Sequence, residues 1–333
     1  MRKILAIDAG GTSTRAVVLD LSGRCLGYGR AGSGNPTAAG VEGAVAELAK
    51  AAERAVTSDG SATGQGSTAL IALAGAVSPL LLERLAERFG ALGFEGEPVI
   101  EPDLLGTYFS GTFGHEGYAI IAGTGAVAGR VTEGRLDFAR GGTGWLLGDG
   151  GSGYWIGHQV VRAVVAALDG LGPDTALTLP LLASVNIETT SGSVRGRPNS
   201  LVSLMDATYA LRPVDLARFA PLAFDALEDP VARGILTASA TALADLLAAT
   251  RAPDVDGPVV LGGSVLAAGM RVAPAIFAEP LEMAAGGAEL IPVTDGVVGA
   301  AVLGLEHAGV DVDAQLFSRL RDDVARLQSA VPL

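Results

Sequence analysis

The stretch that decides the fold lies at residues 3–20 and reads KILAIDAGGTSTRAVVLD. Two apolar segments flank a polar turn, which predicts a β-hairpin whose turn holds a phosphate group, because glycines let backbone amides approach an anion closely. The residues predicted to bind phosphate are Gly10, Gly11, Thr12, Ser13 and Thr14. Asp8 stands where a hydrated Mg²⁺ ion would bridge phosphate oxygens. The alternative is an ordinary hairpin turn that Asp8 caps.

The composition describes a chain of 333 residues with a net charge of −13, 49 % hydrophobic residues and one cysteine. This length favours about two domains. The negative charge argues against nucleic acid as a partner, since its recognition normally requires a basic surface. Cys25 cannot form an internal disulfide, and we expect a small buried residue. No apolar run reaches the roughly 18–20 residues of a membrane helix, so we predict a cytoplasmic protein without membrane contact.

The hydrophobic pattern predicts the same order of elements twice, each time beginning with a strand, a glycine turn and a returning strand. Further strands are expected at 25–30, 68–74, 98–101, 118–122, 127–132, 135–139, 259–261 and 290–293, and helices at 41–56, 79–92, 104–113, 153–168, 179–185, 200–209, 214–227, 231–250, 295–305 and 314–327. Pro221 should kink or split its helix. The repeat predicts two related domains, at 1–117 and 118–333, that face each other across a cleft.

Four short motifs in chain order carry a family resemblance. They are DAGGTST at 8–14, AGTG at 122–125, LGGS at 261–264 and DGVVGAA at 295–301. Together they resemble the actin-like ATPase superfamily, which includes sugar kinases. The segment 141–159, GGTGWLLGDGGSGYWIGHQ, resembles the signature of the N-acetylglucosamine kinase and BadF/BadG/BcrA/BcrD ATPase family. This implies an α/β fold of two actin-like (ribonuclease H-like) domains, each a mixed five-stranded sheet with helices, flanking a nucleotide and substrate cleft.

The resemblance also implies the cofactors ATP and Mg²⁺. ATP would lie between the two hairpins, with Mg²⁺ near Asp8. The predicted second phosphate loop and adenosine motif consist of Gly123, Thr124, Gly125, Gly262, Gly263 and Ser264. The alternative for each segment is a plain glycine turn between a strand and its neighbour.

Sugar phosphorylation requires a base that removes the proton of the attacking hydroxyl group. Asp103 follows an apolar strand and a proline, and by resemblance it matches the catalytic aspartate of the family; the alternative is a helix cap. The predicted sugar-binding residues are Asn35, Asp103, Thr143, Gly144 and Asp149. Family members with sugar kinase activity often carry Trp in place of Thr143 and Glu in place of Gly150, which leaves the identity of the sugar open.

We therefore predict an ATP-dependent kinase of an amino sugar, with N-acetylglucosamine and its 6-phosphate as the first choice of substrate and product. Glucosamine or a related amino sugar is the alternative. A partner-regulating ATPase is a second class of function, but the cluster-binding cysteines of the dehydratase activators in the family are missing here. A homodimer is expected by resemblance.

Overall fold

The computed structural model describes residues 1–188 and 192–330. The first of its two five-stranded sheets has the order β3-β2-β1-β4-β5. Its strands are β1 (Lys3–Ala9), β2 (Thr14–Asp20), β3 (Cys25–Ala31), β4 (Thr68–Leu73) and β5 (Val99–Pro102). The hairpin of β1, β2 and β3 is antiparallel, whereas β4 and β5 extend the sheet in parallel from β1.

The second sheet repeats this arrangement, with the order β12-β11-β6-β7-β8. Its strands are β6 (Gly117–Ala122), β7 (Ala126–Thr132), β8 (Arg135–Gly141), β11 (Val259–Gly262) and β12 (Leu290–Pro292). Strands β6, β7 and β8 are antiparallel, and β11 and β12 continue in parallel from β6. The predicted repeat of a hairpin at the head of each sheet, and the mixed five-stranded sheets of an actin-like fold, are confirmed.

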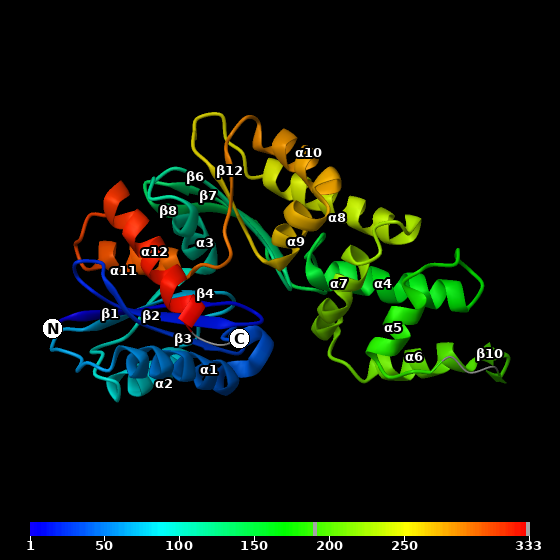
Figure 1. Ribbon diagram of the computed structural model, residues 1–333, viewed down its shortest axis with the longest axis horizontal. Helices are drawn as coiled ribbons and strands as arrows, with labels where there is room; N and C mark the ends of the chain where they lie inside the picture. The colour runs from blue at the N-terminus through cyan, green and yellow to red at the C-terminus, as the bar shows by residue number, and fades with distance from the viewer. Residues whose placement is uncertain (189–191, 331–333) are drawn as a thin grey trace.

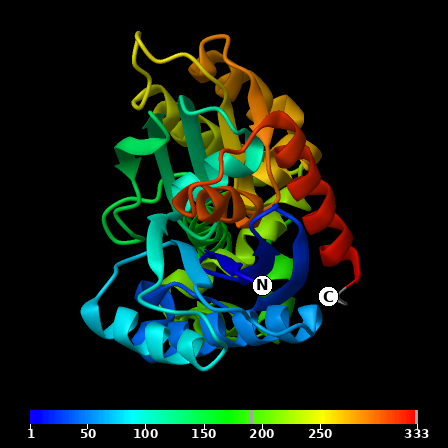
Figure 2. The ribbon, with the colours of Figure 1, turned by 90° about the vertical axis from the view of Figure 1, so that its left-hand side faces the viewer.

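Helices cover both faces of the first sheet (Figures 1 and 2). One face carries α1 (Pro36–Asp59) and α2 (Pro79–Gly90), and the other carries α3 (Asp103–Gly111), α11 (Val297–His307) and α12 (Ala314–Ala330). Gly40 has a φ of 74° and interrupts α1, which explains why the apolar periodicity begins only at Val41. The last two helices of the chain thus pack on the first sheet, in a core that also includes Cys25.

Each sheet and the helices packed on it form one lobe, and the second lobe has the larger helical part. Its helices are α4 (Gly153–Leu168), α5 (Thr178–Ser184), α6 (Asn199–Tyr209), the 3₁₀ helix η1 (Pro213–Phe219), α7 (Ala220–Phe224), α8 (Pro230–Ala248), α9 (Ser264–Val272) and α10 (Pro274–Ala285). A short hairpin consists of β9 (Ser193–Val194) and β10 (Arg197–Pro198). The helix expected at 214–227 is split into η1 and α7, as Pro221 predicted. By length and composition α8 could cross a membrane, contrary to expectation. Its residues Leu236, Leu243 and Leu247 are nevertheless buried in the core of this lobe.

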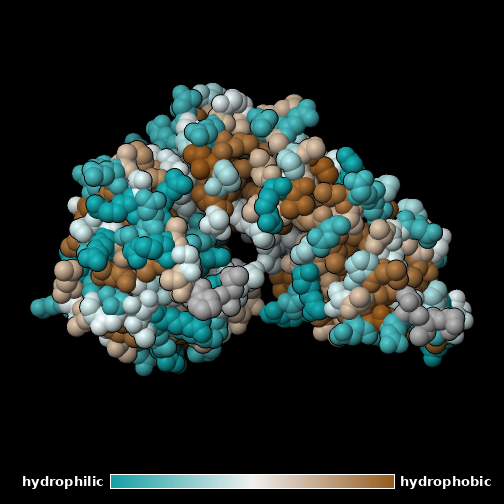
Figure 3. Space-filling view, in the orientation of Figure 1, coloured by the Kyte–Doolittle hydropathy of each residue, from teal (hydrophilic) through white to brown (hydrophobic). Residues whose placement is uncertain are grey.

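Small residues let the helices at the junction of the lobes cross closely. A side chain at Gly299 of α11 would lie 1.9 Å from the carbonyl oxygen of Gly106 in α3. The Gly299 amide donates to Ser110 Oγ at 2.8 Å. At the opposite end of the lobes, Arg212 Nη1 donates to the Ala38 carbonyl oxygen at 2.8 Å. Figure 3 shows the opening that remains between the two lobes.

Candidate nucleotide and sugar site

The turn between β1 and β2 is closed by its own backbone, since the Gly10 amide donates to the Ser13 carbonyl at 3.0 Å. Thr12 is exposed at the tip of this turn. Thr14 is fully buried and its hydroxyl donates to the Gly32 carbonyl at 2.8 Å. Of the three predicted hydroxyl residues, Thr12 therefore faces solvent, whereas Thr14 anchors the loop inside the lobe.

The turn between β6 and β7 rests on the N-terminus of α4. The Gly123 amide donates to the Gly125 carbonyl at 3.0 Å, which closes this second loop. The first amides of α4 then donate back to the loop, from Gly153 to the Gly123 carbonyl at 2.7 Å and from Tyr154 to the Thr124 carbonyl at 3.1 Å. The positive end of a helix dipole consequently lies directly behind the second loop.

The two loops meet at their tips. Thr12 Oγ1 lies 3.1 Å from Thr124 Oγ1, across the gap between the lobes. A side chain at Gly11 would also lie 3.7 Å from the Thr124 side chain. The structure therefore brings both predicted phosphate loops together, although 112 residues separate the two threonines in the chain.

Asp8 is a buried carboxylate at the end of β1, beside the first loop. Its Oδ2 accepts a hydrogen bond from the Gly296 amide at 3.0 Å and lies 3.8 Å from Arg15 Nη1. Burial raises the pKa of Asp8 to about 7; the Asp295 charge adds to this and Arg15 opposes it, with a further increase from Asp103. A side chain at Gly296 would lie 2.7 Å from Asp8 Oδ1, so the carboxylate requires glycine at this position.

Asp103 is the first residue of α3 and directly follows β5. Burial raises its pKa to about 6, and hydrogen bonds from the backbone amides of Leu104 and Asp103 itself oppose that increase. Asp103 is not the cap residue of α3, since that position is Pro102 and no side-chain hydrogen bond caps the helix there. The same carboxylate lies close enough to Asp8 for its charge to raise the pKa of that residue.

Asn35 caps α1 and joins it to the loop after β4. Its Oδ1 accepts a hydrogen bond from the Thr37 amide at 2.8 Å. A side chain at Gly75 would lie 2.3 Å from the same Oδ1, and the φ of +98° at Gly75 also favours glycine. Asn35 therefore caps α1, and Gly75 packs closely against its side chain.

The loop that connects β8 with α4 carries the other predicted sugar contacts. A side chain at Gly148 would lie 2.0 Å from Thr143 Oγ1, so Thr143 folds back onto its own loop. The Gly144 carbonyl accepts the Gly148 amide at 2.9 Å. Trp145 packs edge-on against Tyr154 of α4, with ring centroids 6.0 Å apart. Thr143 and Gly144 thus belong to a compact loop over the start of α4.

Asp149 lies next to the second phosphate loop. Its Oδ1 accepts the Ala126 amide at 3.2 Å, and its carboxylate lies about 3.1 Å from the position of a side chain at Gly125. Its φ of 59° is uncommon for a residue other than glycine. Burial raises the pKa of Asp149, and the Ala126 hydrogen bond opposes this.

The predicted adenosine motif forms the tight turn from β11 into α9. Gly263 has a φ of +92°, and a side chain there would lie 2.4 Å from the Ala122 carbonyl oxygen. A side chain at Gly262 would lie 2.7 Å from Thr107. Ser264 is the first residue of α9. The turn therefore packs directly against the end of β6, where the second phosphate loop begins.

The single carboxylate of Asp8 fits a metal ion that is bound mainly by water and by the phosphates of a bound molecule. Within the ranges 1–188 and 192–330, no group of three or more His, Cys, Asp or Glu residues is arranged to hold a metal ion. Mg²⁺ usually keeps several waters and binds one or two carboxylates together with substrate phosphates. A single buried carboxylate beside a phosphate loop matches that pattern.

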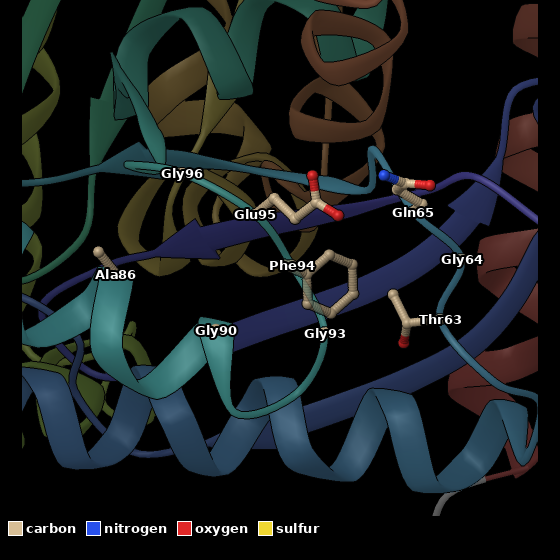
Figure 4. Close-up of a pocket in the computed structure, with 9 residues that line it drawn as sticks. All are labelled: Thr63, Gly64, Gln65, Ala86, Gly90, Gly93, Phe94, Glu95 and Gly96. Carbon is tan, nitrogen blue, oxygen red and sulfur yellow. The ribbon is translucent and has the colours of Figure 1, made fainter.

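A surface depression lies elsewhere, beside the N-terminal ends of β4 and β5. It has a volume of about 540 Å³ and is lined by residues 63–65, 86, 90 and 93–96 (Figure 4). Glu95 is its only acidic residue, and it accepts a hydrogen bond from the Gly66 amide. None of the predicted site residues lines this depression.

Comparison with known proteins agrees with this geometry. The sequence model of the BadF/BadG/BcrA/BcrD ATPase family matches residues 5–304. The chain belongs to this family. The N-acetyl-D-glucosamine kinase of Dictyostelium discoideum is 30 % identical over 257 residues, which cover 73 % of this chain and 77 % of that protein. The glucosamine kinase of Vibrio cholerae is 29 % identical and matches 53 % of this chain and 59 % of its own length.

A solved structure of the same fold comes from Chromobacterium violaceum, for a protein provisionally named an N-acetylglucosamine kinase. It has a TM-score of 0.70 and 22 % identity, and the match covers 91 % of this chain and 99 % of that chain. This likeness confirms the predicted fold of this member of the BadF/BadG/BcrA/BcrD ATPase family.

Sequence reasoning missed two charged residues of the site, Arg15 and Asp295. Asp8 and Arg15 are direct partners in the antiparallel register of β1 and β2. Because the turn was identified correctly, the pairing of the oppositely charged Asp8 and Arg15 could have been predicted from the sequence. Asp295 could not be paired with Arg15 from the sequence, because 280 residues separate them and only the packing of α11 on β1 joins them.

Proposed function

We propose that this family member is an ATP-dependent kinase that transfers a phosphoryl group to the 6-hydroxyl of an amino sugar, N-acetylglucosamine first. One observation carries the proposal: two carboxylates, the buried Asp8 and the partly buried Asp103, interact electrostatically at a site next to two glycine-threonine loops that touch at their tips. Kinases of this kind need phosphate-binding loops, a carboxylate for the metal ion and a second carboxylate for the hydroxyl proton.

The loops divide the nucleotide between them. The amides of Gly10 and Gly11 and the hydroxyl of Thr12 would bind phosphate from one side, and Gly123, Thr124 and Gly125 from the other. The turn at 262–264 would receive the adenosine. Asp8 would hold Mg²⁺ through water, and the ion would neutralise charge on the phosphate oxygens when bound.

Asp103 has the properties of a general base. Its pKa of about 6 leaves it mostly ionised at neutral pH, yet closer to the pKa of a useful proton acceptor than an exposed aspartate. In the proposed reaction Asp103 accepts the proton of the sugar hydroxyl as the oxygen attacks the terminal phosphorus of ATP, and the bond from that phosphorus to the bridging oxygen breaks to release ADP. The remaining predicted sugar contacts are Asn35, Thr143, Gly144 and Asp149.

Two relatives support an amino sugar as the acceptor, one named for N-acetylglucosamine and one for glucosamine. Glucosamine is therefore the second candidate. A Cβ atom at Gly150 would approach Ala242, at 3.7 Å. The glutamate that family members with sugar kinase activity often carry at this position is therefore not sterically excluded. We include Mg²⁺, a cytoplasmic location and a homodimer in the proposal; light scattering of the purified chain tests the dimer.

The decisive experiment measures ATP consumption with a panel of hexoses, hexosamines and N-acetylated sugars. We expect stimulation by N-acetylglucosamine, and the position of the phosphate on the product is read by NMR. ATP turnover that no sugar stimulates would overturn the kinase proposal in favour of a partner-regulating ATPase.

Asp103→Asn tests the base directly. We expect a loss of kcat by about 10²–10⁴-fold with ATP binding retained. In the unchanged protein, kcat/KM should rise with pH between about 6 and about 7, as Asp103 and Asp8 lose their protons. The stability of the fold depends on pH in the opposite direction. Because burial favours the neutral carboxyl group, ionisation of Asp103 lowers the free energy of unfolding as the pH rises from about 4 to 6. At pH 7 the unfolding temperature of Asp103→Asn should therefore be no lower than that of the unchanged protein. Normal turnover by this variant would exclude Asp103 as the base.

A further inference from the structure

Arg15 makes three polar contacts at the first phosphate loop. Its Nη1 donates to Ser13 Oγ at 3.0 Å and lies 3.8 Å from Asp8 Oδ2, while its Nε lies 3.2 Å from Asp295 Oδ2. The side chains of Asp8 and Asp295 are 13 % and 7 % exposed. One guanidinium group is therefore shared by two largely buried carboxylates, and the closer of the two belongs to Asp295.

Asp295 is itself fixed from two directions. Its Oδ1 accepts the Val297 amide at 3.2 Å, at the start of α11. Its Oδ2 also accepts a hydrogen bond from Gln328 Nε2 at 3.0 Å, from α12. The position of the Asp295 carboxylate is thus determined by the C-terminal helices and not by the phosphate loop.

The competition for Arg15 has a consequence for Asp8. Without the Asp295 charge, the guanidinium group would turn to Asp8, the other carboxylate near it within residues 1–188 and 192–330. A bidentate pair with arginine occupies both oxygens of a carboxylate and cancels its charge toward a cation. Asp8 would then attract a hydrated divalent cation less strongly.

We infer that Asp295 is a positioning residue: it draws Arg15 away from Asp8 and thereby sets the affinity of the phosphate site for Mg²⁺. This inference rests on the proposed use of Mg²⁺–ATP at this site. The Gln328 hydrogen bond extends it, because α12 would support Mg²⁺ binding through Asp295 without touching the nucleotide.

The test measures binding of a fluorescent ATP analogue to the full chain during titration with MgCl₂, in the absence of any sugar. Asp295→Asn should raise the Mg²⁺ concentration for half-maximal binding by about tenfold. Nucleotide affinity at saturating Mg²⁺ should change less than about twofold. Asp137→Asn, which removes the partner of Arg130 on β8, is the matched control and should leave the Mg²⁺ curve unchanged.

Two further variants keep the inference falsifiable if Asp295→Asn folds poorly. Gln328→Leu should shift the Mg²⁺ curve in the same direction by about two- to threefold. The double variant Arg15→Gln/Asp295→Asn should bring it back toward the original, because the competing cation is gone. An unchanged curve in Asp295→Asn or Gln328→Leu, or no restoration in the double variant, would overturn the inference. Failure of the proposed function has a different signature: no sugar stimulates ATP consumption by the unchanged protein.

Discussion

The two hairpins at the heads of the sheets share one arrangement of strands but differ in their surroundings. In each, an antiparallel pair of strands ends in a glycine-threonine turn, and the sheet continues in parallel from the first strand. The hairpin of β1 and β2 is surrounded by charge, from Asp8, Arg15, Asp295 and Asp103. The hairpin of β6 and β7 instead has the N-terminus of α4 behind it.

This difference shows how a duplicated scaffold can divide one task. The N-terminus of α4 supplies a fixed partial positive charge, which suits phosphate oxygens at any pH, while its first amides hold the carbonyl groups of the loop in place. The carboxylates of Asp8 and Asp103 suit a metal ion and a proton, because their pKa values of about 7 and 6 lie near neutrality. In the proposed reaction both lobes would therefore share nucleotide binding, while the first lobe would bind the metal ion and accept the proton.

The largest expected effect is a kinetic difference between substitutions of one aspartate in each lobe. Asp8→Asn removes the carboxylate charge for Mg²⁺ and should reduce kcat/KM by about 10²–10³-fold, with a higher Mg²⁺ requirement. Asp149→Asn keeps an oxygen for the Ala126 amide. It should instead raise the KM for the sugar, by about tenfold, and leave the Mg²⁺ requirement unchanged. Steady-state kinetics with varied MgCl₂ and varied sugar measures both.

Both variants should remain folded, since burial already disfavours the charged forms of these residues. Thermal unfolding provides the control. A change in the Mg²⁺ requirement of Asp149→Asn, equal to that of Asp8→Asn, would contradict the division of labour between the hairpins.

The sequence was most informative where a signal is local. The hairpin at residues 3–20 and the turn at 122–125 were predicted because apolar alternation and glycine positions depend on nearby residues. The direction of the Thr14 side chain was not predictable, since its hydroxyl donates to the carbonyl of Gly32, the residue after the neighbouring strand β3. The sequence likewise did not predict that α1 starts at Pro36 and is interrupted at Gly40.

Long-range packing accounts for what the sequence could not reveal about the site. Asp8 needs the Gly296 amide, and Arg15 needs Asp295, yet both partners come from the end of the chain. The raised pKa values of Asp8 and Asp103 arise mainly from burial, which depends on how α3 and α11 cross. A motif can predict which residues meet a ligand, but the electrostatic environment follows only from the packed fold.

The second prediction concerns the glycines of the β6–β7 lobe and is intermediate in size. Gly263→Ala places a methyl group 2.4 Å from the Ala122 carbonyl at a φ of +92°, which should destabilise the fold by about 1–3 kcal/mol. Gly123→Ala meets no atom within 4 Å. It should unfold normally but raise the KM for ATP if the loop binds phosphate, by about three- to tenfold. Urea unfolding and ATP kinetics distinguish the two, and equal stability losses would refute this assignment of roles.

The smallest expected effect lies where the hairpins touch. The hydrogen bond between Thr12 and Thr124 is exposed, so Thr12→Val and Thr124→Val should each lower stability by less than about 1 kcal/mol. Thr12→Ser keeps the hydroxyl and serves as the control. In a double-mutant cycle the coupling free energy should be about 0.5 kcal/mol in the free protein. It should fall to zero with a saturating non-hydrolysable ATP analogue, because phosphate oxygens then take both hydroxyls. A coupling free energy that persists with the analogue bound would mean that the two loops contact each other and not the nucleotide.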